Sequence, residues 1–81
     1  MKVLYSAHFT RSYSKAPAAI QRAFDKQAQL LLQNLTHPSL HAKKYDEERD
    51  LWQARVTGSW RFYFSIEDDT YHLHEIKAHP K

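Results

Sequence analysis

The sequence lacks cysteine, long apolar segments, internal repeats and low-complexity tracts. Without cysteine the chain can form no disulfide bond and perform no thiolate chemistry, which fits a cytoplasmic protein. The N-terminal stretch MKVLYSAHF is too short an apolar run for a signal peptide, and no segment is apolar over the length that a bilayer requires. We therefore expect a cytoplasmic protein with no membrane partner.

The chain of 81 residues is expected to form one domain, residues 1–81, around a single modest core. Hydrophobic residues make up 42% of the chain and aromatic residues 14%, which favours folding over disorder. Twelve Lys and Arg residues stand against nine Asp and Glu, so the formal net charge is +3. This balance favours polyanionic partners, although many basic proteins without such a partner share it.

The stretch from Leu51 to His79 predicts a three-stranded antiparallel meander. Aromatic and β-branched residues dominate its strands, and a Gly-Ser turn and an Asp-Asp-Thr turn join them; the strands are Leu51–Thr57, Arg61–Ile66 and Tyr71–Ala78. Alternation places a set of apolar side chains on one face: Trp52, Ala54, Val56, Phe62, Phe64 and Leu73. We expect this face to be buried.

The strand pairing follows from keeping those apolar side chains together. We expect a first loop of residues 58–60, with Arg55 opposite Tyr63, because a regular two-residue loop would invert the side chains of one strand. In the second hairpin we expect His74 opposite Tyr63 and a β-bulge near Glu75, which turns Ile76 and Ala78 inward. The opposite face would then be basic and rich in imidazole, with Arg55, Arg61, Tyr63, His72, His74, Lys77 and His79. Such a face is suited to binding phosphate.

The rest of the chain predicts an α+β protein in which helices cover the apolar face of a mainly antiparallel sheet. In chain order we expect Lys2–Ala7 as a strand, His8–Ser14 as a short helix, Ala18–Leu35 as a long amphipathic helix and Leu40–Asp50 as a lead-in and exposed loop. Ser14 is a candidate N-cap of the long helix, with Pro17 in its first turn.

Several motifs now stand in a recognisable order: His37-Pro38-Ser39-Leu40, Lys43-Lys44, Trp52-x-x-Arg55-Val56, Trp60-Arg61-Phe62-x-Phe64 and Ile76-x-x-His79. Their order and spacing resemble the RelE/ParE superfamily of bacterial toxins from type II toxin–antitoxin modules, over nearly the whole chain. The resemblance implies the small RelE-like fold: an N-terminal strand, one short and one long helix, and a C-terminal meander.

The resemblance also implies a toxin that a cognate antitoxin protein holds silent. RelE-like members are metal-independent endoribonucleases that cleave mRNA, usually on the ribosome, and so inhibit translation. ParE-like members share the fold but inhibit DNA gyrase without nuclease activity. We therefore expect an endoribonuclease whose partners are an antitoxin, mRNA and the ribosome. A gyrase inhibitor and a catalytically silent antitoxin-binding domain are the alternatives.

By position, the resemblance assigns phosphate contact to Arg61 and proton transfer to His79, and it places Arg55 and Gln53 where related nucleases carry basic strand residues. Metal-free RNA cleavage needs a base for the 2′-OH, cations for the phosphorane and an acid for the leaving oxygen. Histidine suits proton transfer and arginine suits phosphate binding. We predict a catalytic group of Arg61, His79 and Arg55. The predicted RNA-binding residues are Lys43, Lys44, Gln53, Trp60, Tyr63, His74 and Lys77.

Other interpretations of these residues stay open. Trp60 and Tyr63 could stack on an exposed base, or they could pack at the sheet edge. His72 and His74 point the same way on a strand, so zinc could bind there if His79 and His41 joined them as further ligands. Because the sequence has no CxxC or HExxH motif, we expect no metal and no cofactor.

Overall fold

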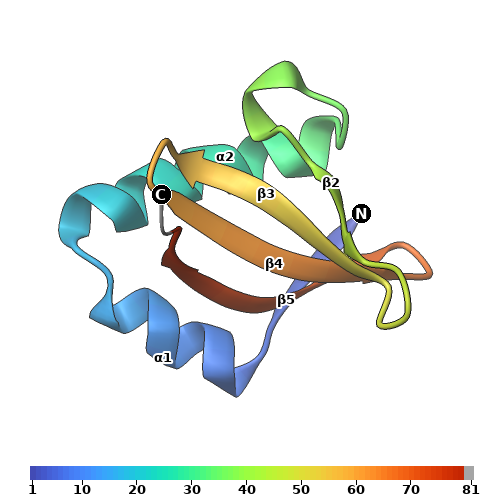
Figure 1. The fold of residues 1–81 in the computed structure, drawn as a ribbon, viewed down its shortest axis with the longest axis horizontal. Coiled ribbons are helices and arrows are strands. Elements are labelled where there is room, and N and C mark those ends of the chain that lie inside the picture. Colours follow the sequence, from blue (N-terminus) through green and yellow to red (C-terminus); the bar gives the residue numbers. More distant parts are fainter. Residues whose placement is uncertain (80–81) are drawn as a thin grey trace.

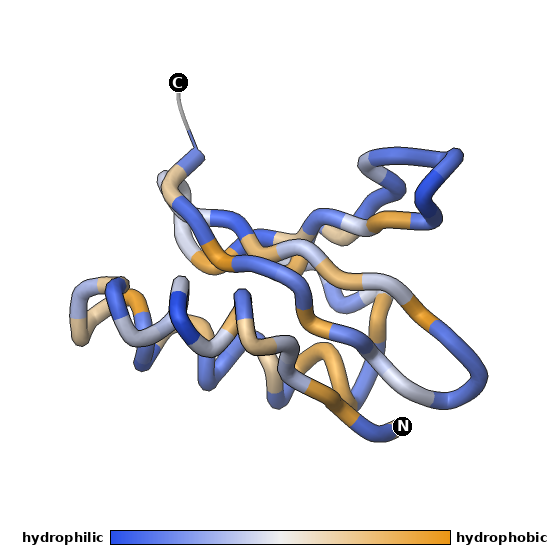
Figure 2. The backbone as a smooth tube through the Cα atoms, turned by 90° about the horizontal axis from the view of Figure 1, so that it is seen from below, coloured by the Kyte–Doolittle hydropathy of each residue, from blue (hydrophilic) through white to orange (hydrophobic). Residues whose placement is uncertain are grey.

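The computed structural model describes residues 1–79. In this part of the chain a five-stranded mixed sheet, in the order β1-β5-β4-β3-β2, carries two helices on one face, as Figures 1 and 2 show. The elements are β1 (Lys2–Tyr5), α1 (Ala7–Lys15), α2 (Ala18–Gln33), the 3-10 turn η1 (Pro38–Leu40), β2 (Lys43–Asp46), β3 (Leu51–Thr57), β4 (Trp60–Glu67) and β5 (Thr70–Ala78). This arrangement confirms the expected α+β class. No helix in residues 1–79 has the length and apolar character needed to cross a membrane.

The two helices begin differently from the prediction. Ser6 caps α1, since its Oγ accepts a hydrogen bond from the backbone N of Phe9 at 2.9 Å. The prediction that Ser14 caps α2 is wrong, because the Ser14 hydroxyl donates to the carbonyl of Arg11 at 3.0 Å. Pro17 itself precedes the first turn of α2, without a side-chain cap. The proline ring fixes φ of this residue, here −57°, at a value that suits the start of a helix.

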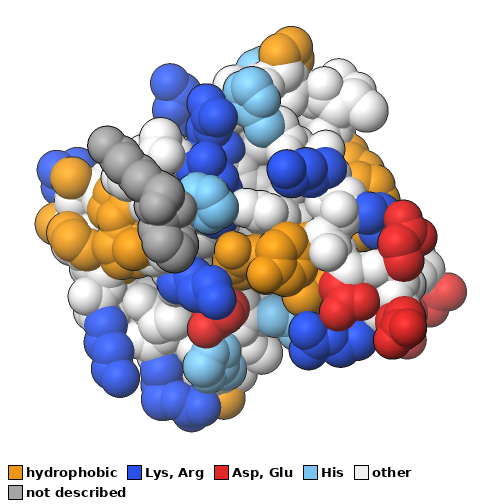
Figure 3. Space-filling model, in the orientation of Figure 1, with side chains coloured by type: hydrophobic (Ala, Val, Ile, Leu, Met, Phe, Trp, Pro, Cys, Tyr) orange, Lys and Arg blue, Asp and Glu red, His pale blue; other side chains and the backbone are white. Residues whose placement is uncertain are grey.

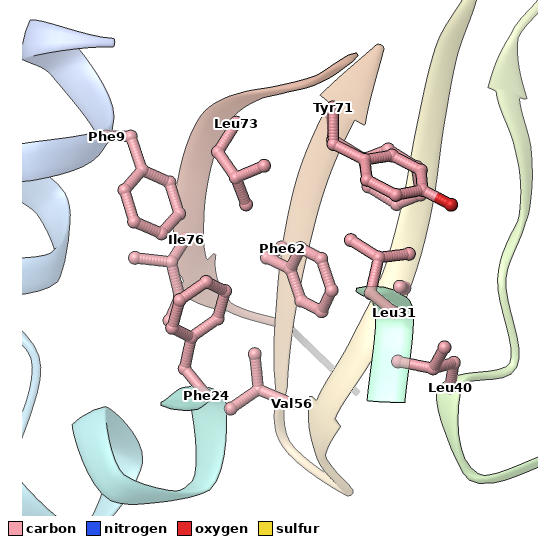
Figure 4. Packing of buried hydrophobic residues seen from close by; sticks show 11 residues of the cluster. Phe9, Phe24, Leu31, Leu40, Val56, Phe62, Tyr71, Leu73 and Ile76 are labelled. Carbon is pink, nitrogen blue, oxygen red and sulfur yellow. The ribbon is translucent and has the colours of Figure 1, made fainter. Parts of the chain in front are cut away.

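The core lies between α2, α1 and the apolar face of the sheet, as Figure 4 shows. Phe24 from α2 meets Phe62 from β4 edge-to-face, with ring centroids 5.2 Å apart. The buried cluster consists of Phe9, Phe24, Leu31, Leu40, Ala54, Val56, Phe62, Phe64, Tyr71, Leu73 and Ile76. The prediction that the long helix covers the apolar face is therefore confirmed. Trp52, which was expected to be buried, is only half-buried at the margin of this cluster.

The register of the first hairpin differs from the prediction by two residues. Arg55 pairs with Arg61 rather than Tyr63, and Gln53 pairs with Tyr63. A two-residue turn joins the strands. A regular turn of this length would put the side chains of one strand on the wrong face, but an irregularity between Arg55 and Thr57 restores the expected faces. Because the side-chain period of a strand is two, the shift leaves every residue on the face predicted for it.

The second hairpin contains the expected bulge, placed one residue earlier than Glu75. Phe64 pairs with Leu73 and Tyr63 pairs with Glu75, so His74 is the extra residue. The prediction of His74 opposite Tyr63 is therefore wrong. Downstream of the bulge Ile76 is buried, as expected, whereas Ala78 is exposed.

The segment Leu40–Asp50 is more ordered than the sequence indicates. Instead of a lead-in and loop, it contributes the end of η1 and the edge strand β2, which pairs antiparallel with β3. Its residues KKYD carry little apolar character, so the pairing with β3 decides its conformation.

Candidate functional site

A hollow of about 410 Å³ opens on the face of the sheet that the helices do not cover. Its lining comes from the η1–β2 connection, β2, β3, β4 and the end of β5: His41, Ala42, Lys43, Gln53, Arg55, Arg61 and His79. Two arginines, a lysine and two histidines therefore surround it, and none of its lining residues within 1–79 is acidic. The charge of this lining favours an anion over a cation.

Charge is distributed unevenly over this face. In Figure 3, Lys, Arg and His side chains gather around the hollow, and most acidic side chains gather at the other end of the sheet. The acidic end consists of the β2–β3 and β4–β5 turns, with Asp46, Glu47, Glu48, Asp50, Glu67, Asp68 and Asp69. A binding partner with complementary charges would therefore bind across the sheet in one preferred orientation.

Two arginines of the hollow face each other across neighbouring strands. Arg55 on β3 and Arg61 on β4 are direct Cα partners, and alternation puts both side chains on the same open face. Like charges directly opposite each other destabilise an antiparallel pair. Within residues 1–79 neither guanidinium takes part in an ion pair with a carboxylate. Within this part of the chain Arg61 therefore forms no surface ion pair with the acidic residues of the β2–β3 turn.

Backbone carbonyls of the β3–β4 turn hold Arg61 in place. Its Nη1 donates to the carbonyl oxygens of Thr57 at 2.6 Å, Trp60 at 3.0 Å and Gly58 at 3.3 Å. Among residues 1–79, Nε and Nη2 have no hydrogen-bond partner. One edge of the guanidinium is thus fixed by the turn, and its other donors remain available for a ligand.

Arg55 is held differently. Its Nε is buried and has no hydrogen-bond partner among residues 1–79. Leaving a buried donor unsatisfied typically costs about 1–3 kcal/mol, and more for a charged group. Arg55 also lines the hollow, so an anion bound there would offset part of this cost by pairing with the guanidinium charge.

A buried polar network behind the hollow joins its walls. Gln27 on α2 is only 7% exposed, and its Nε2 donates to the carbonyls of Arg55 at 2.9 Å and Ser39 at 3.1 Å. In return, the Ser39 hydroxyl donates to Gln27 Oε1 at 3.2 Å. One helix side chain therefore links β3 to η1, and η1 leads directly into His41.

The two histidines of the hollow lie at its opposite ends along the sheet. The backbone N of His79 donates to the Ser59 carbonyl at 2.7 Å, which fixes the end of β5 beside the β3–β4 turn. His41 closes η1 in a left-handed conformation, with φ of 47°. Each imidazole is exposed and can act on a ligand in the hollow.

The structure brings together five of the ten predicted site residues: Arg55, Arg61, His79, Lys43 and Gln53. It places the other five elsewhere. Lys44 points away from Lys43, forms an ion pair with Asp50 and lies 5.4 Å from the Trp52 ring. Trp60 shares the helix-facing side of β4 with Phe62 and lies near α1. Both residues therefore lie outside the hollow, because neighbouring residues of a strand point to opposite faces.

Tyr63, Lys77 and His74 lie on the open face of the sheet but outside the hollow. Tyr63 is 6% exposed, because Tyr45 packs edge-on at 5.1 Å and the Lys77 ammonium lies 5.4 Å from its ring. It is therefore covered and presents no platform for a base, and burial raises its pKa above the ordinary value. His74, in the bulge, has its Nε2 2.8 Å from Ser65 Oγ.

Sequence reasoning missed the roles of His41 and Gln27 in this site. His41 entered only as a possible zinc ligand, and no group of three or more His, Asp or Glu side chains in residues 1–79 is arranged to hold a metal. Gln27 was not singled out from the sequence. Its burial depends on contacts 12 and 28 residues away, which no local pattern encodes.

No protein-family model matches the chain, and no curated protein sequence matches it. Solved structures match it closely in shape. The YoeB/ParE toxin from Agrobacterium tumefaciens superposes with a TM-score of 0.81 at 12% identity, covering 99% of this chain and 100% of the other. A chain of the archaeal RelE–RelB complex from Pyrococcus horikoshii gives 0.80 at 19% identity, covering 99% and 96%. A chain of the RelBE2 toxin–antitoxin complex from Mycobacterium tuberculosis gives 0.76 at 21% identity, covering 95% of each.

The protein thus has the fold of the RelE/ParE toxins, as its motifs predicted. Identities of 12–21% establish the fold alone. The activity has to be argued from the site.

Proposed function

We propose that this protein is the toxin of a type II toxin–antitoxin module and cleaves mRNA on the ribosome, in the cytoplasm, as a metal-independent endoribonuclease. The cross-strand pair of Arg55 and Arg61, in a hollow that no carboxylate of residues 1–79 lines, carries the proposal. A pair of like charges lowers stability unless an anion lies between them, so its presence is best explained by a phosphate ligand. Lys43 and Gln53 extend the donor set along the next strand pair.

The side chains of the hollow suit cleavage as well as binding. Arg61 offers the donors left over from its turn contacts, and Arg55 offers its positive charge, to the charge that develops on the phosphorane. His79 transfers a proton at one of the two oxygens involved. Attack of the 2′-OH would leave a 2′,3′-cyclic phosphate and a 5′-OH, and these groups together supply charge stabilisation and proton transfer without a metal ion.

The proposed protein partner is an antitoxin. Solved relatives in fold include a RelB–RelE antitoxin–toxin complex from Methanococcus jannaschii and a YoeB–YefM complex from Staphylococcus aureus. For this chain we expect an antitoxin with an acidic or amphipathic segment, because the basic hollow would speed its association and apolar contacts would add affinity. An adjacent gene that encodes such a protein and suppresses toxicity is the expected observation.

Induction in cells tests the toxin and its target together. The wild type should arrest growth and generate new RNA 5′-OH ends, whereas His79→Gln should reduce cleavage roughly 10²–10⁴-fold. His72→Gln is the matched control, because His72 lies on β5, the strand that leads into His79, but outside the hollow. DNA breaks without new RNA ends would replace the proposal with gyrase inhibition. Absence of any growth effect would overturn the toxin assignment.

A further inference from the structure

His41 occupies a position in the hollow that no sequence motif assigned to it. It precedes Lys43 by two residues, and Lys43 pairs with Gln53, which lies two residues before Arg55 on the antiparallel strand β3. His41 therefore lies at the level of Arg55, on its outer side. It is exposed and lines the hollow.

His79 lies on the other side of the arginine pair, nearer the β3–β4 turn. Lys77 pairs with Arg61, and His79 lies two residues beyond it, fixed by its hydrogen bond to Ser59. Across the sheet the order is thus His41 beside β3, Arg55, Arg61, and His79 at the end of β5. Three strand spacings, about 14 Å, separate the backbones of β2 and β5, with the two arginines between them.

We propose that His41 is the proton-transfer partner of His79 in the RNA cleavage proposed above, so this inference rests on that function. In an in-line displacement the attacking and leaving oxygens lie on opposite sides of phosphorus. A base and an acid must therefore approach from opposite sides, with the cations at the phosphate between them. The arrangement of His41, the arginine pair and His79 meets this requirement.

The step balances with these two imidazoles alone. One neutral imidazole takes the proton of the 2′-OH while the 2′-oxygen forms a bond to phosphorus. The bond from phosphorus to the 5′-oxygen breaks, and the second, protonated imidazole donates its proton to that oxygen. The pair ends with its protonation states exchanged, and the products are a 2′,3′-cyclic phosphate and a 5′-OH.

His41→Asn is the test variant, because asparagine tolerates the left-handed backbone of this residue and transfers no proton near neutral pH. The cleavage site is first mapped with wild-type protein on an mRNA bound to ribosomes. At that site His41→Asn should lower the cleavage rate roughly 10²–10⁴-fold. His37→Asn serves as control, since residue 37 caps the same turn η1 outside the hollow and asparagine is also a good cap. It should change the rate by less than about threefold.

A second mRNA, with sulfur in place of the 5′-oxygen at the mapped bond, separates proton transfer from structural damage. A thiolate leaves without protonation, so cleavage of this substrate needs no general acid but still needs the general base. Exactly one of the two variants, His41→Asn or His79→Gln, should therefore regain wild-type rates on it. Rescue of neither or of both, or full activity of His41→Asn on ordinary mRNA, would overturn the role of His41. Absence of cleavage by the wild type would instead overturn the proposed function itself.

Discussion

Replacing Arg55 by methionine should make the protein more stable and less active. The change removes a buried Nε without a partner and a like charge facing Arg61, while methionine keeps much of the side-chain volume. Relief of the unsatisfied donor and of the repulsion should together add about 1–2 kcal/mol to the free energy of unfolding. For a domain of this size that raises Tm by roughly 4–16 °C.

The matched change at Arg61 should have the opposite effect on stability. Arg61→Met relieves the same repulsion but loses the donor that contacts three carbonyls of the β3–β4 turn, which on balance should lower stability by about 1 kcal/mol and Tm by roughly 4–8 °C. Both variants should lose on the order of a hundredfold in cleavage rate, because both cations stabilise the phosphorane. Arg22→Met, at an exposed position of α2, removes the same charge and should change neither quantity appreciably.

Thermal melts in low-phosphate buffer and cleavage of ribosome-bound mRNA measure the two effects. A lower Tm for Arg55→Met than for the wild type would show that Arg55 is a structural residue with a satisfied side chain. Full cleavage by Arg55→Met would refute the argument that the arginine pair exists to bind phosphate.

Three further changes probe other parts of the account. Gln27→Met should lower the free energy of unfolding by about 2–4 kcal/mol, because it leaves two carbonyls unsatisfied, whereas Gln29→Met on the exposed side of α2 should be near neutral in chemical denaturation. Burial and the neighbouring imidazole of His72 lower the pKa of His74, so the folded state favours neutral His74. The contribution of His74 to stability is therefore complete above the pKa of the unfolded chain, about 6.5, and declines as the pH falls below that value. The fall in Tm between pH 7.5 and 5.5 should therefore be smaller in His74→Asn, and an equal fall would contradict this cause. Lys43→Met should reduce the slope of log RNA affinity against log salt concentration by about 1, and an unchanged slope would show that Lys43 does not contact RNA. Lys44→Met is the control: the Lys44 ammonium is paired with Asp50, so its loss should leave the slope unchanged.

The fold was predictable where burial imposes a period. Apolar spacing in α2 and alternation in β3, β4 and β5 identified the core face, and this result survived a register shift of two residues because the strand period is two. β2 was missed because its residues KKYD have no apolar pattern; its order comes from pairing with β3. Such an edge strand is specified by its neighbour, which a local pattern does not contain.

The site was predictable to the same extent and for the same reason. Alternation correctly placed Arg55, Arg61 and His79 on one face. Applied to Trp60 as well, it would have placed this residue on the opposite face, together with Phe62, and so outside the site. His41 could not be placed from the sequence, because its position depends on β2 and on a turn that the Gln27 network holds.

The chemistry of the RNA ends tests the central claim most directly. Wild-type protein acts on mRNA bound to ribosomes in magnesium buffer, and both new ends at the main cleavage site are then identified. The account predicts a 2′,3′-cyclic phosphate and a 5′-OH, and it predicts no cleavage when the nucleotide before the scissile bond carries 2′-deoxyribose, because the 2′-OH is the nucleophile. A 3′-OH with a 5′-phosphate, or cleavage of the 2′-deoxy substrate at the wild-type rate, would contradict it.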